Sequence, residues 1–215
     1  MQLIHGDCLE VLKSMPDESI DCIITDPPYG TNTSNRDSCM VGEFSNVMPL
    51  VLPELYRVLK KDGAFYCFTS WKMLSDWMLR YQQYFKLQNL IVWDKKRHSG
   101  CYSPSSWQFT WEGVFFGIKQ KHKIREYQKD VLFSEEKRGT AMQKPVDIIE
   151  KLLKASSDEN QIIFDPFMGS GSTGVACVKN NRNFIGCEIS KEYYEIANKR
   201  IKDTLALRTT ATICN

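Results

Sequence analysis

The stretch Ile20-Asp21-Cys22-Ile23-Ile24-Thr25-Asp26-Pro27-Pro28-Tyr29-Gly30 joins a short apolar run to an acid, two prolines and an aromatic ring. The apolar run is rich in β-branched residues and has the length of a buried strand. Neither proline can donate to a sheet ladder, and each restricts the residue before it, so the strand must end here. We therefore expect a stiff corner at the carboxyl end of a strand.

This corner presents one carboxylate, two backbone carbonyls and one ring. The set suits an exocyclic amino group on a flat heterocycle, because the Asp26 carboxylate and a proline carbonyl can accept its two N–H bonds while Tyr29 stacks on the base. The simpler interpretation of two prolines after a strand is a plain turn.

Composition limits the classes of protein that fit. The 215 residues suit one sizeable domain, and 42% hydrophobic residues with mixed charge are typical of an ordered globular chain. A net charge of +2 means that any nucleic-acid surface is a local patch. Eight cysteines without a Cys-x-x-Cys pair, and three histidines, predict buried reduced thiols and no metal site. No signal peptide or membrane-length apolar run is visible, so we expect a cytoplasmic protein.

Strand and helix patterns alternate along the whole chain, which predicts a doubly wound α/β sheet. The expected helices are Cys8–Met15, Val47–Lys60, Trp71–Phe85, one opened by Pro145, one after the glycine-rich loop, and a last helix that carries Tyr193 and Tyr194. The expected strands are Gln2–Asp7, Ile20–Thr25, Ala64–Thr69, Lys86–Trp93, a strand or hairpin at Trp107–Phe116, Gln161–Asp165 and Asn183–Glu188. Ligands bind at the carboxyl ends of the strands in such sheets, and Asp26, Asp165 and Glu188 all fall there.

The second informative stretch is a glycine-rich loop. Strand Gln161–Asp165 runs into Pro166-Phe167-Met168-Gly169-Ser170-Gly171-Ser172-Thr173-Gly174, and a helix follows. Glycines let the backbone approach a ligand closely, and a helix N-terminus favours negative charge. Glu188 lies about the distance downstream at which an acid accepts ribose hydroxyls.

The same glycines allow a rival interpretation. Gly169-x-Gly171-x-x-Gly174 also satisfies the dinucleotide fingerprint, so an NAD-dependent oxidoreductase is the alternative from another class. Only one further strand is readable after the loop, whereas a dinucleotide fold continues through more βα units, and this argues against it.

Two motifs carry a resemblance to a known family. Asp26-Pro27-Pro28-Tyr29 resembles the catalytic motif of the amino-directed DNA methyltransferases, and Asp165-Pro166-Phe167 before the glycines is similar to their cofactor motif. The catalytic motif comes first and the cofactor loop last, which resembles the permuted β class. The resemblance implies S-adenosylmethionine as cofactor and a mostly parallel, seven-stranded Rossmann-like sheet with one antiparallel strand. Asp-Pro-Pro-Tyr resembles the adenine-N6 enzymes, with cytosine-N4 as the alternative target.

The resemblance also implies roles for individual residues. The catalytic set is Asp26, Pro27, Pro28 and Tyr29. The cofactor set is Asp7, Lys144, Asp165, Pro166, Phe167, Gly169, Ser170, Gly171, Thr173 and Glu188. Within it, Asp7 is equally well explained as the cap of the helix that follows. Lys144 belongs to a Gln-Lys-Pro segment that the family places over the methionine end of the cofactor.

DNA contacts are expected from two places. Arg36 lies in the aperiodic loop 30–46, and Lys95, Lys96 and Arg97 form a basic run that is equally typical of a solvated turn. The chain reads as one catalytic domain, 1–215, with the short segment 120–142 in place of a target-recognition domain. The expected partner is double-stranded DNA, with the target base flipped out, and a homodimer is the alternative to a single copy of the chain. A non-catalytic DNA-binding subunit is the alternative outside the enzymes.

Overall fold

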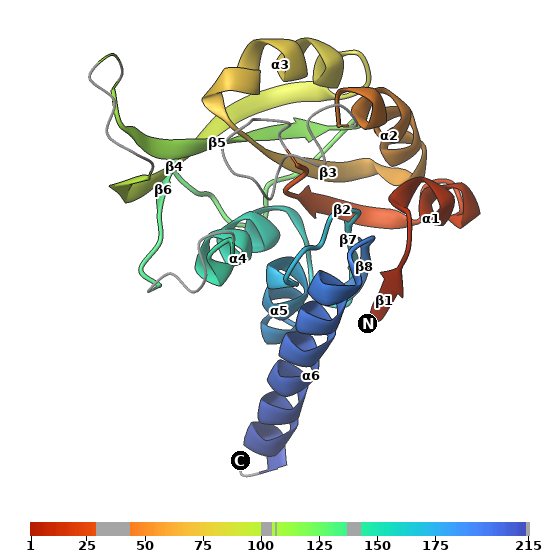
Figure 1. Cartoon of the computed structure of the whole chain (residues 1–215). Helices are drawn as coiled ribbons and strands as arrows, with labels where there is room; N and C mark the ends of the chain where they lie inside the picture. The colour runs from red at the N-terminus through yellow and green to blue at the C-terminus, as the bar shows by residue number, and fades with distance from the viewer. Residues whose placement is uncertain (29–43, 100–104, 106, 137–142, 214–215) are drawn as a thin grey trace.

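The computed structural model describes residues 1–28, 44–99, 105, 107–136 and 143–213, with the backbone alone at 44–47, 97–99 and 211–213. Its described strands form one sheet in the order β1-β8-β7-β2-β3-β5-β4-β6 (Figure 1). The strands are β1 (Gln2–His5), β2 (Ile20–Thr25), β3 (Leu59–Thr69), β4 (Lys86–Ser99), β5 (Phe109–Ile118), β6 (Val131–Phe133), β7 (Ile162–Asp165) and β8 (Asn183–Glu188). Only β5 among them runs antiparallel to its neighbours.

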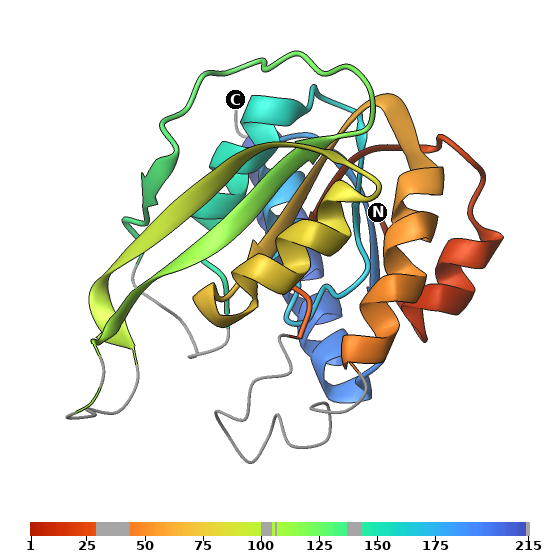
Figure 2. The same ribbon diagram turned by 90° about the horizontal axis from the view of Figure 1, so that it is seen from above.

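Helices cover both faces of the sheet. One face carries α1 (Cys8–Ser14), α2 (Phe44–Val58) and α3 (Leu74–Gln82), and a short 3-10 turn, η1 (Trp71–Met73), precedes α3 (Figures 1 and 2). The other face carries α4 (Val146–Ser156), α5 (Ser172–Lys179) and α6 (Lys191–Ile213). Two separate apolar clusters follow from this arrangement, one under each helical layer. The predicted doubly wound α/β class is confirmed.

The central strand β3 shows why the two layers form. Its residues from Ala64 to Thr69 are all buried, as expected for a strand covered on both faces. Phe65 stacks on Tyr81 of α3 with ring centroids 5.0 Å apart, whereas the Tyr66 hydroxyl lies 2.6 Å from Ser156 Oγ of α4 on the other side. Alternate side chains of one strand thus anchor opposite layers.

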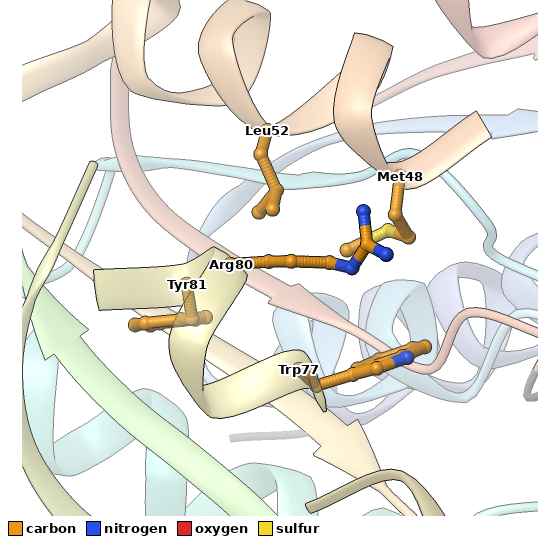
Figure 3. Close-up of a pocket in the computed structure, with 5 residues that line it drawn as sticks. All are labelled: Met48, Leu52, Trp77, Arg80 and Tyr81. Atoms are coloured by element: carbon orange, nitrogen blue, oxygen red, sulfur yellow. The ribbon is translucent and has the colours of Figure 1, made fainter. Parts of the chain in front are cut away.

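The α2–α3 contact is close-packed. Met48 and Leu52 of α2 face Trp77, Arg80 and Tyr81 of α3 across a narrow gap, and the Arg80 side chain extends along it (Figure 3). The gap holds about one water at most. It lies within one helical layer and is part of the packing.

The strand order places a switch point between β7 and β2. From β7 the chain passes through α5 to β8 on one side, and from β2 it passes through α2 to β3 on the other. Adjacent strands whose connections depart in opposite directions leave a crevice at their carboxyl ends, which is where ligands bind in such sheets. Asp26 directly follows β2, and Asp165 is the last residue of β7.

Three sequence expectations need correction. The described sheet has eight strands, not seven, because Val131–Phe133 pairs with β4 as an added edge strand. Strand β4 continues through Ser99, so the basic run after Trp93 lies within the strand, at a register shift between Asp94 and Ser99, and not in a turn after it. Helix α2 ends at Val58, two residues earlier than expected, because Leu59 already pairs with Ile20 as the start of β3.

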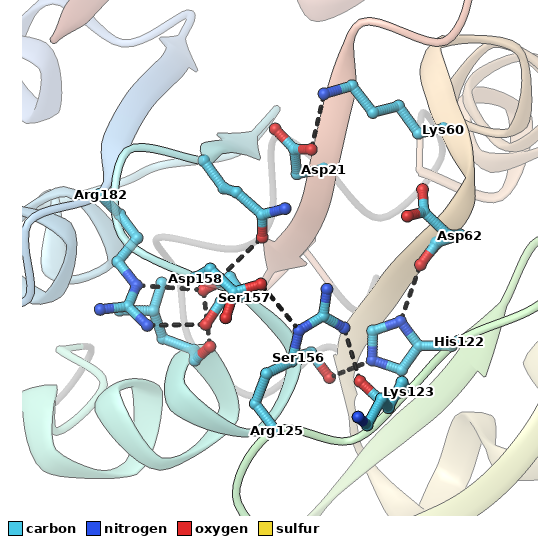
Figure 4. Close-up of polar contacts among 12 residues, drawn as sticks. Asp21, Lys60, Asp62, His122, Lys123, Arg125, Ser156, Ser157, Asp158 and Arg182 are labelled. Atoms are coloured by element: carbon cyan, nitrogen blue, oxygen red, sulfur yellow. Dashed lines mark hydrogen bonds and ion pairs between the residues drawn. The ribbon is translucent and has the colours of Figure 1, made fainter.

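The segment after β5 is tied to the start of β3 and to the end of α4 (Figure 4). His122 Nδ1 lies 2.8 Å from the Asp62 carbonyl oxygen, and His122 Nε2 lies 3.0 Å from Ser156 Oγ. Arg125 donates to Asp158, and its backbone N–H donates to the Ala155 carbonyl. These contacts hold the start of the predicted 120–142 segment against the sheet and α4.

Candidate active site

Three acids stand at the carboxyl ends of three adjacent strands. Asp26 follows β2, Asp165 ends β7 and Glu188 ends β8, and these strands are neighbours in the order β8-β7-β2. Thr25 Oγ1 donates to Asp165 Oδ1 at 2.7 Å, which ties the ends of β2 and β7 together. The two motifs therefore lie together at the carboxyl ends of neighbouring strands, as predicted.

The Asp26 corner is built as the sequence predicts, as far as Pro28. Pro27 is buried and Pro28 is half-buried, which fixes the backbone that carries the acid. The Asp26 side chain is 29% exposed, so its carboxylate lies at the mouth of the crevice and not in the core. Tyr29, the fourth predicted catalytic residue, lies outside the described residues.

A chain of four alternating charges begins at Asp26. The Lys144 ammonium, from the segment before α4, pairs with Asp26 Oδ2 and lies 3.2 Å from Glu112 Oε2 of β5. Glu112 Oε1 in turn pairs with Lys95 of β4. The side chains of Lys144, Glu112 and Lys95 are 14%, 16% and 9% exposed, so this is a buried network.

The charges in the network stabilise one another. Burial disfavours the Lys144 ammonium, but Asp26 and Glu112 outweigh it and raise the pKa of Lys144 above its ordinary value. Burial likewise disfavours the Glu112 carboxylate, but Lys144 and Lys95 outweigh it and lower the pKa of Glu112. Lys144 is therefore an ammonium and Glu112 a carboxylate. Lys144, expected at the cofactor, pairs with Asp26 in this structure.

Asp165 supports the glycine loop from inside. Its side chain is buried and accepts from Thr25 Oγ1, from Thr173 Oγ1 at 2.7 Å and from the Phe167 backbone N–H at 3.1 Å. Burial raises the pKa of Asp165 to about 7, although these three bonds oppose the shift. Asp165 and Thr173 thus hold the turn between β7 and α5, and Pro166 is buried beneath it. Phe167 packs partly buried against the layer of α1 to α3.

Gly169 and Gly171 have different roles in the loop. Gly169 and Gly171 have φ angles of +50° and +82°, in the left-handed region that favours glycine. A Cβ at Gly171 would lie 2.9 Å from Ala197 Cβ of α6, so this glycine permits close approach of helix and loop. Among the described residues, a Cβ at Gly169 would meet only the Phe167 carbonyl oxygen, at 4.0 Å. Gly169 is therefore the glycine whose missing side chain leaves room for a ligand.

Glu188 joins this cradle from the next strand. Its Oε2 accepts from the Gly169 N–H at 3.0 Å and its Oε1 from the Ser190 N–H at 2.8 Å. Each oxygen keeps a second lone pair, so the carboxylate can still accept hydroxyl groups of a ligand. An open glycine backbone beside an oriented, half-buried carboxylate fits the ribose of S-adenosylmethionine.

Asp7 and Ser170 have structural partners at the same edge. Asp7 caps α1, because its Oδ1 accepts from the Leu9 N–H at 2.8 Å. The cap is therefore observed, and a cofactor contact by Asp7 stays a prediction. Ser170 Oγ accepts from Arg200 of α6 at 3.1 Å. Arg200 also faces the Gln143 side-chain amide, so it links the glycine loop to the segment that carries Lys144.

Sequence reasoning missed Arg200 and Glu112. No motif marks either residue: Arg200 is one of several basic residues on the last helix, and Glu112 is a single acid in an aromatic strand. Their significance comes only from the register of β5 and the packing of α6.

The residues expected to contact DNA are only partly described. Arg36 lies outside the described residues, and for Arg97 only the backbone is described. Lys95 points inward to Glu112 and lies 5.4 Å from the Trp93 ring centroid, which favours a structural role over a phosphate contact. Lys96 is exposed, with its ammonium 4.6 Å from the Phe133 ring centroid. Lys96 remains a candidate phosphate contact.

The described residues contain neither a metal-binding cluster nor a membrane-spanning helix. No group of three or more His, Cys, Asp and Glu side chains there could hold a metal ion. No helix there is long and apolar enough to cross a membrane. Cys8, Cys22, Cys67, Cys177 and Cys187 are buried free thiols, as predicted for these positions.

Comparison with known proteins decides the family. The N6/N4 DNA methylase family model, described as a DNA methylase, matches residues 20–199. This chain belongs to that family. The match begins at the first residue of β2 and spans the Asp26 corner, the glycine loop and Glu188.

Individual relatives cover nearly the whole chain. The DNA adenine methyltransferase YhdJ of Escherichia coli K12 is 28% identical over 93% of this chain and 82% of its own length. The type II methyltransferase M.HpaI of Haemophilus parainfluenzae is 31% identical over 93% of this chain and 74% of its own. The solved M1.HpyAVI–SAM complex is 26% identical, covers 93% of this chain and 98% of that chain, and has a TM-score of 0.73. The predicted family, fold, methyltransferase class and S-adenosylmethionine cofactor are confirmed.

Proposed function

We propose that this member of the family transfers the methyl group of S-adenosylmethionine to the N6 amino group of adenine in double-stranded DNA. The observation that carries the proposal is the position of the Asp26 carboxylate. It lies at the end of β2, directly beside β7 and the glycine loop that follows it. A base amine at Asp26 and a cofactor at Gly169 and Glu188 would therefore meet at one edge of the sheet.

The residues of the Asp26 corner would activate the amine. An aromatic amine is a poor nucleophile because its lone pair is conjugated into the ring. Asp26 and the Pro27 carbonyl would accept its two N–H bonds and favour a pyramidal nitrogen, while Tyr29 would stack on the base. When bound, S-adenosylmethionine would supply the methyl group on a sulfonium, an activated donor that leaves as a neutral thioether. The methylated nitrogen would then lose one proton to water. Alignment of the two reactants supplies much of the barrier lowering.

The target base must leave the helical stack to reach Asp26. Enzymes that modify a base inside a duplex extrude it into the active site, because the reacting atom is otherwise inaccessible. The partial exposure of Asp26 at the crevice mouth is consistent with entry of a base from outside.

Adenine is favoured over cytosine by two observations. The corner reads Asp-Pro-Pro-Tyr, which resembles the adenine-N6 enzymes, and the relative YhdJ is named a DNA adenine methyltransferase. Cytosine-N4 is the second candidate, because the family includes both targets. The family match removes the ground for an NAD-dependent oxidoreductase.

We also propose that the chain acts as a single catalytic domain with weak sequence readout. Residues after β5 bind the start of β3 and the end of α4 through His122 and Arg125, whereas Asp26 follows the far end of β2, which runs parallel to β3. That part of the 120–142 segment is therefore badly placed to read bases at the active site. We expect either a short, loosely defined recognition sequence or a dimer in which two copies share the DNA, in the cytoplasm of a bacterial or phage-infected cell.

Methyl transfer from tritiated S-adenosylmethionine tests the proposal. Wild-type protein should label DNA, whereas Asp26→Ala should not label it and should bind the cofactor with nearly unchanged affinity by calorimetry. Label transfer by Asp26→Ala within about tenfold of wild type, about 1.4 kcal/mol in barrier, would remove Asp26 from the chemistry. Cofactor binding without any transfer by wild type would favour a non-catalytic subunit.

A further inference from the structure

Lys144 occupies one oxygen of the carboxylate that the target amine needs. Its ammonium pairs with Asp26 Oδ2, and the proposed function requires that carboxylate to accept an N–H of the base. A neutral amine competes poorly with a buried ammonium for the same oxygen. Positive charge also develops on the amine nitrogen as the methyl group arrives, and an adjacent ammonium opposes it. Methyl transfer should therefore be faster if Lys144 binds elsewhere while the amine is at Asp26.

Glu112 offers that second place. Its Oε2 lies 3.2 Å from Lys144 Nζ, is buried, and makes no geometrically sound hydrogen bond within the described part of the chain. Its other oxygen, Oε1, is already held by Lys95. The acceptor capacity of Glu112 is thus open on the side that faces Lys144.

We propose that Lys144 alternates between two carboxylates during the reaction, and that Glu112 is a positioning residue that draws it off Asp26. Lys144 rests on Asp26 before the base arrives and moves onto Glu112 when the target amine takes its place. The inference rests on the proposed function, because it assigns the motion to binding of the base amine at Asp26.

Moving Lys144 from Asp26 to Glu112 costs little free energy. Two ammonium groups and two carboxylates share the site, so shifting Lys144 transfers no proton and leaves the buried charges balanced. The ammonium already touches both carboxylates, so small changes at the end of its side chain complete the switch. Lys95 holds Glu112 in place from the far side, and Lys95 is itself buried against the Trp93 ring.

Steady-state kinetics of Glu112→Gln test the role. The amide keeps the shape but attracts Lys144 less, so kcat at saturating DNA and cofactor should fall about tenfold or more, as for loss of one bond to a charged group. Cofactor affinity by calorimetry should stay within about threefold, less than 1 kcal/mol. Glu112→Asp should restore part of kcat. Glu150→Gln serves as the matched control, because it removes a carboxylate of α4 that pairs with Lys179 of α5. Its kcat should be unchanged.

The double variant Glu112→Gln/Lys144→Met separates switching from simple structural support. If Lys144 blocks Asp26 when Glu112 is lost, removing its charge should raise kcat above that of Glu112→Gln alone. A double variant as slow as the single variant, or slower, overturns the proposal. So does a Glu112→Gln enzyme that keeps wild-type kcat.

A structure of Asp26→Asn gives a readout that does not need activity. Without the Asp26 charge, Lys144 Nζ should leave the side chain at position 26 and form a well-aligned hydrogen bond with Glu112 Oε2, closer than the present 3.2 Å. An ammonium that stays at position 26 overturns the inference even if wild type methylates DNA. An inactive wild type would instead contradict the proposed function, while this structure would still test whether Lys144 has two positions.

Discussion

Substitution of alanine at Gly171 or at Gly169 should damage different properties of the protein. At Gly171 the φ angle of +82° costs a non-glycine residue about 1 kcal/mol. The new Cβ would also lie 2.9 Å from Ala197 Cβ and 3.0 Å from Ala197 Cα, and a helix backbone gives way poorly. Overpacking of this kind costs about 1–3 kcal/mol. We expect Gly171→Ala to lower the free energy of unfolding by about 2–4 kcal/mol.

Gly169→Ala carries the backbone cost alone. Its φ is +50°, and its new Cβ meets nothing closer than the Phe167 carbonyl oxygen at 4.0 Å, so the loss of stability should be about 1 kcal/mol. The methyl group would instead enter the cradle beside Glu188. We expect cofactor affinity to fall about tenfold or more, a change of at least about 1.4 kcal/mol.

Urea unfolding followed by circular dichroism measures the first quantity, and calorimetry with S-adenosylmethionine measures the second under conditions where both variants are folded. The two variants form a matched pair, because they differ only in which neighbour the added methyl meets. Equal stability of the two variants, or normal cofactor binding by Gly169→Ala, would refute the division of roles between these glycines.

Three further outcomes are expected. Glu188→Ala should weaken cofactor binding by about 1.5–3 kcal/mol in calorimetry, because a charged acceptor is lost, and should lower kcat at saturating cofactor far less. A large loss of kcat with normal cofactor affinity would instead place Glu188 in the chemistry. Thr25→Val keeps the shape but removes the donor to buried Asp165, so urea unfolding should show a loss of about 1.5–3 kcal/mol, and an unchanged midpoint would contradict that bond. Burial lowers the pKa of His122, so its contribution to stability is present above about pH 6.5 and is lost as the pH falls below it. The difference in unfolding free energy between wild type and His122→Gln should therefore shrink from pH 7.5 to 5.5, and a constant difference would refute the assignment.

The catalytic edge could be predicted because its signals are local. An apolar run followed at once by an acid marks the carboxyl end of a strand. This pattern predicts that Asp26, Asp165 and Glu188 lie at the same end of the sheet, as they do. Alternation of strands and helices fixed the layers in the same way. Buried free thiols such as Cys22 and Cys67 followed from the absence of metal-ligand spacing.

Roles that depend on distant neighbours could not be read from the sequence. Whether Asp165 faces a ligand or the interior depends on Thr25 and Thr173, and only the fold brings Thr25 to it. The Glu112–Lys144 contact joins residues far apart in the chain, through the pairing of β5 with β4 and β3. The partner of Gly171 is Ala197, a small residue that no loop motif includes.

Weak local patterns account for the errors in secondary structure. β6 has only three residues, and its neighbours in the sequence are largely charged. Its conformation is therefore decided by its pairing with β4.

The most direct test of the whole account is the chemical identity of the modified base. DNA is incubated with the protein and S-adenosylmethionine that carries a trideuterated methyl group, digested to nucleosides and analysed by mass spectrometry. The account predicts trideuterated N6-methyldeoxyadenosine with wild type and none with Asp26→Ala. Trideuterated N4-methyldeoxycytidine, or unmodified DNA from a wild-type protein that binds the cofactor, would contradict the central claim.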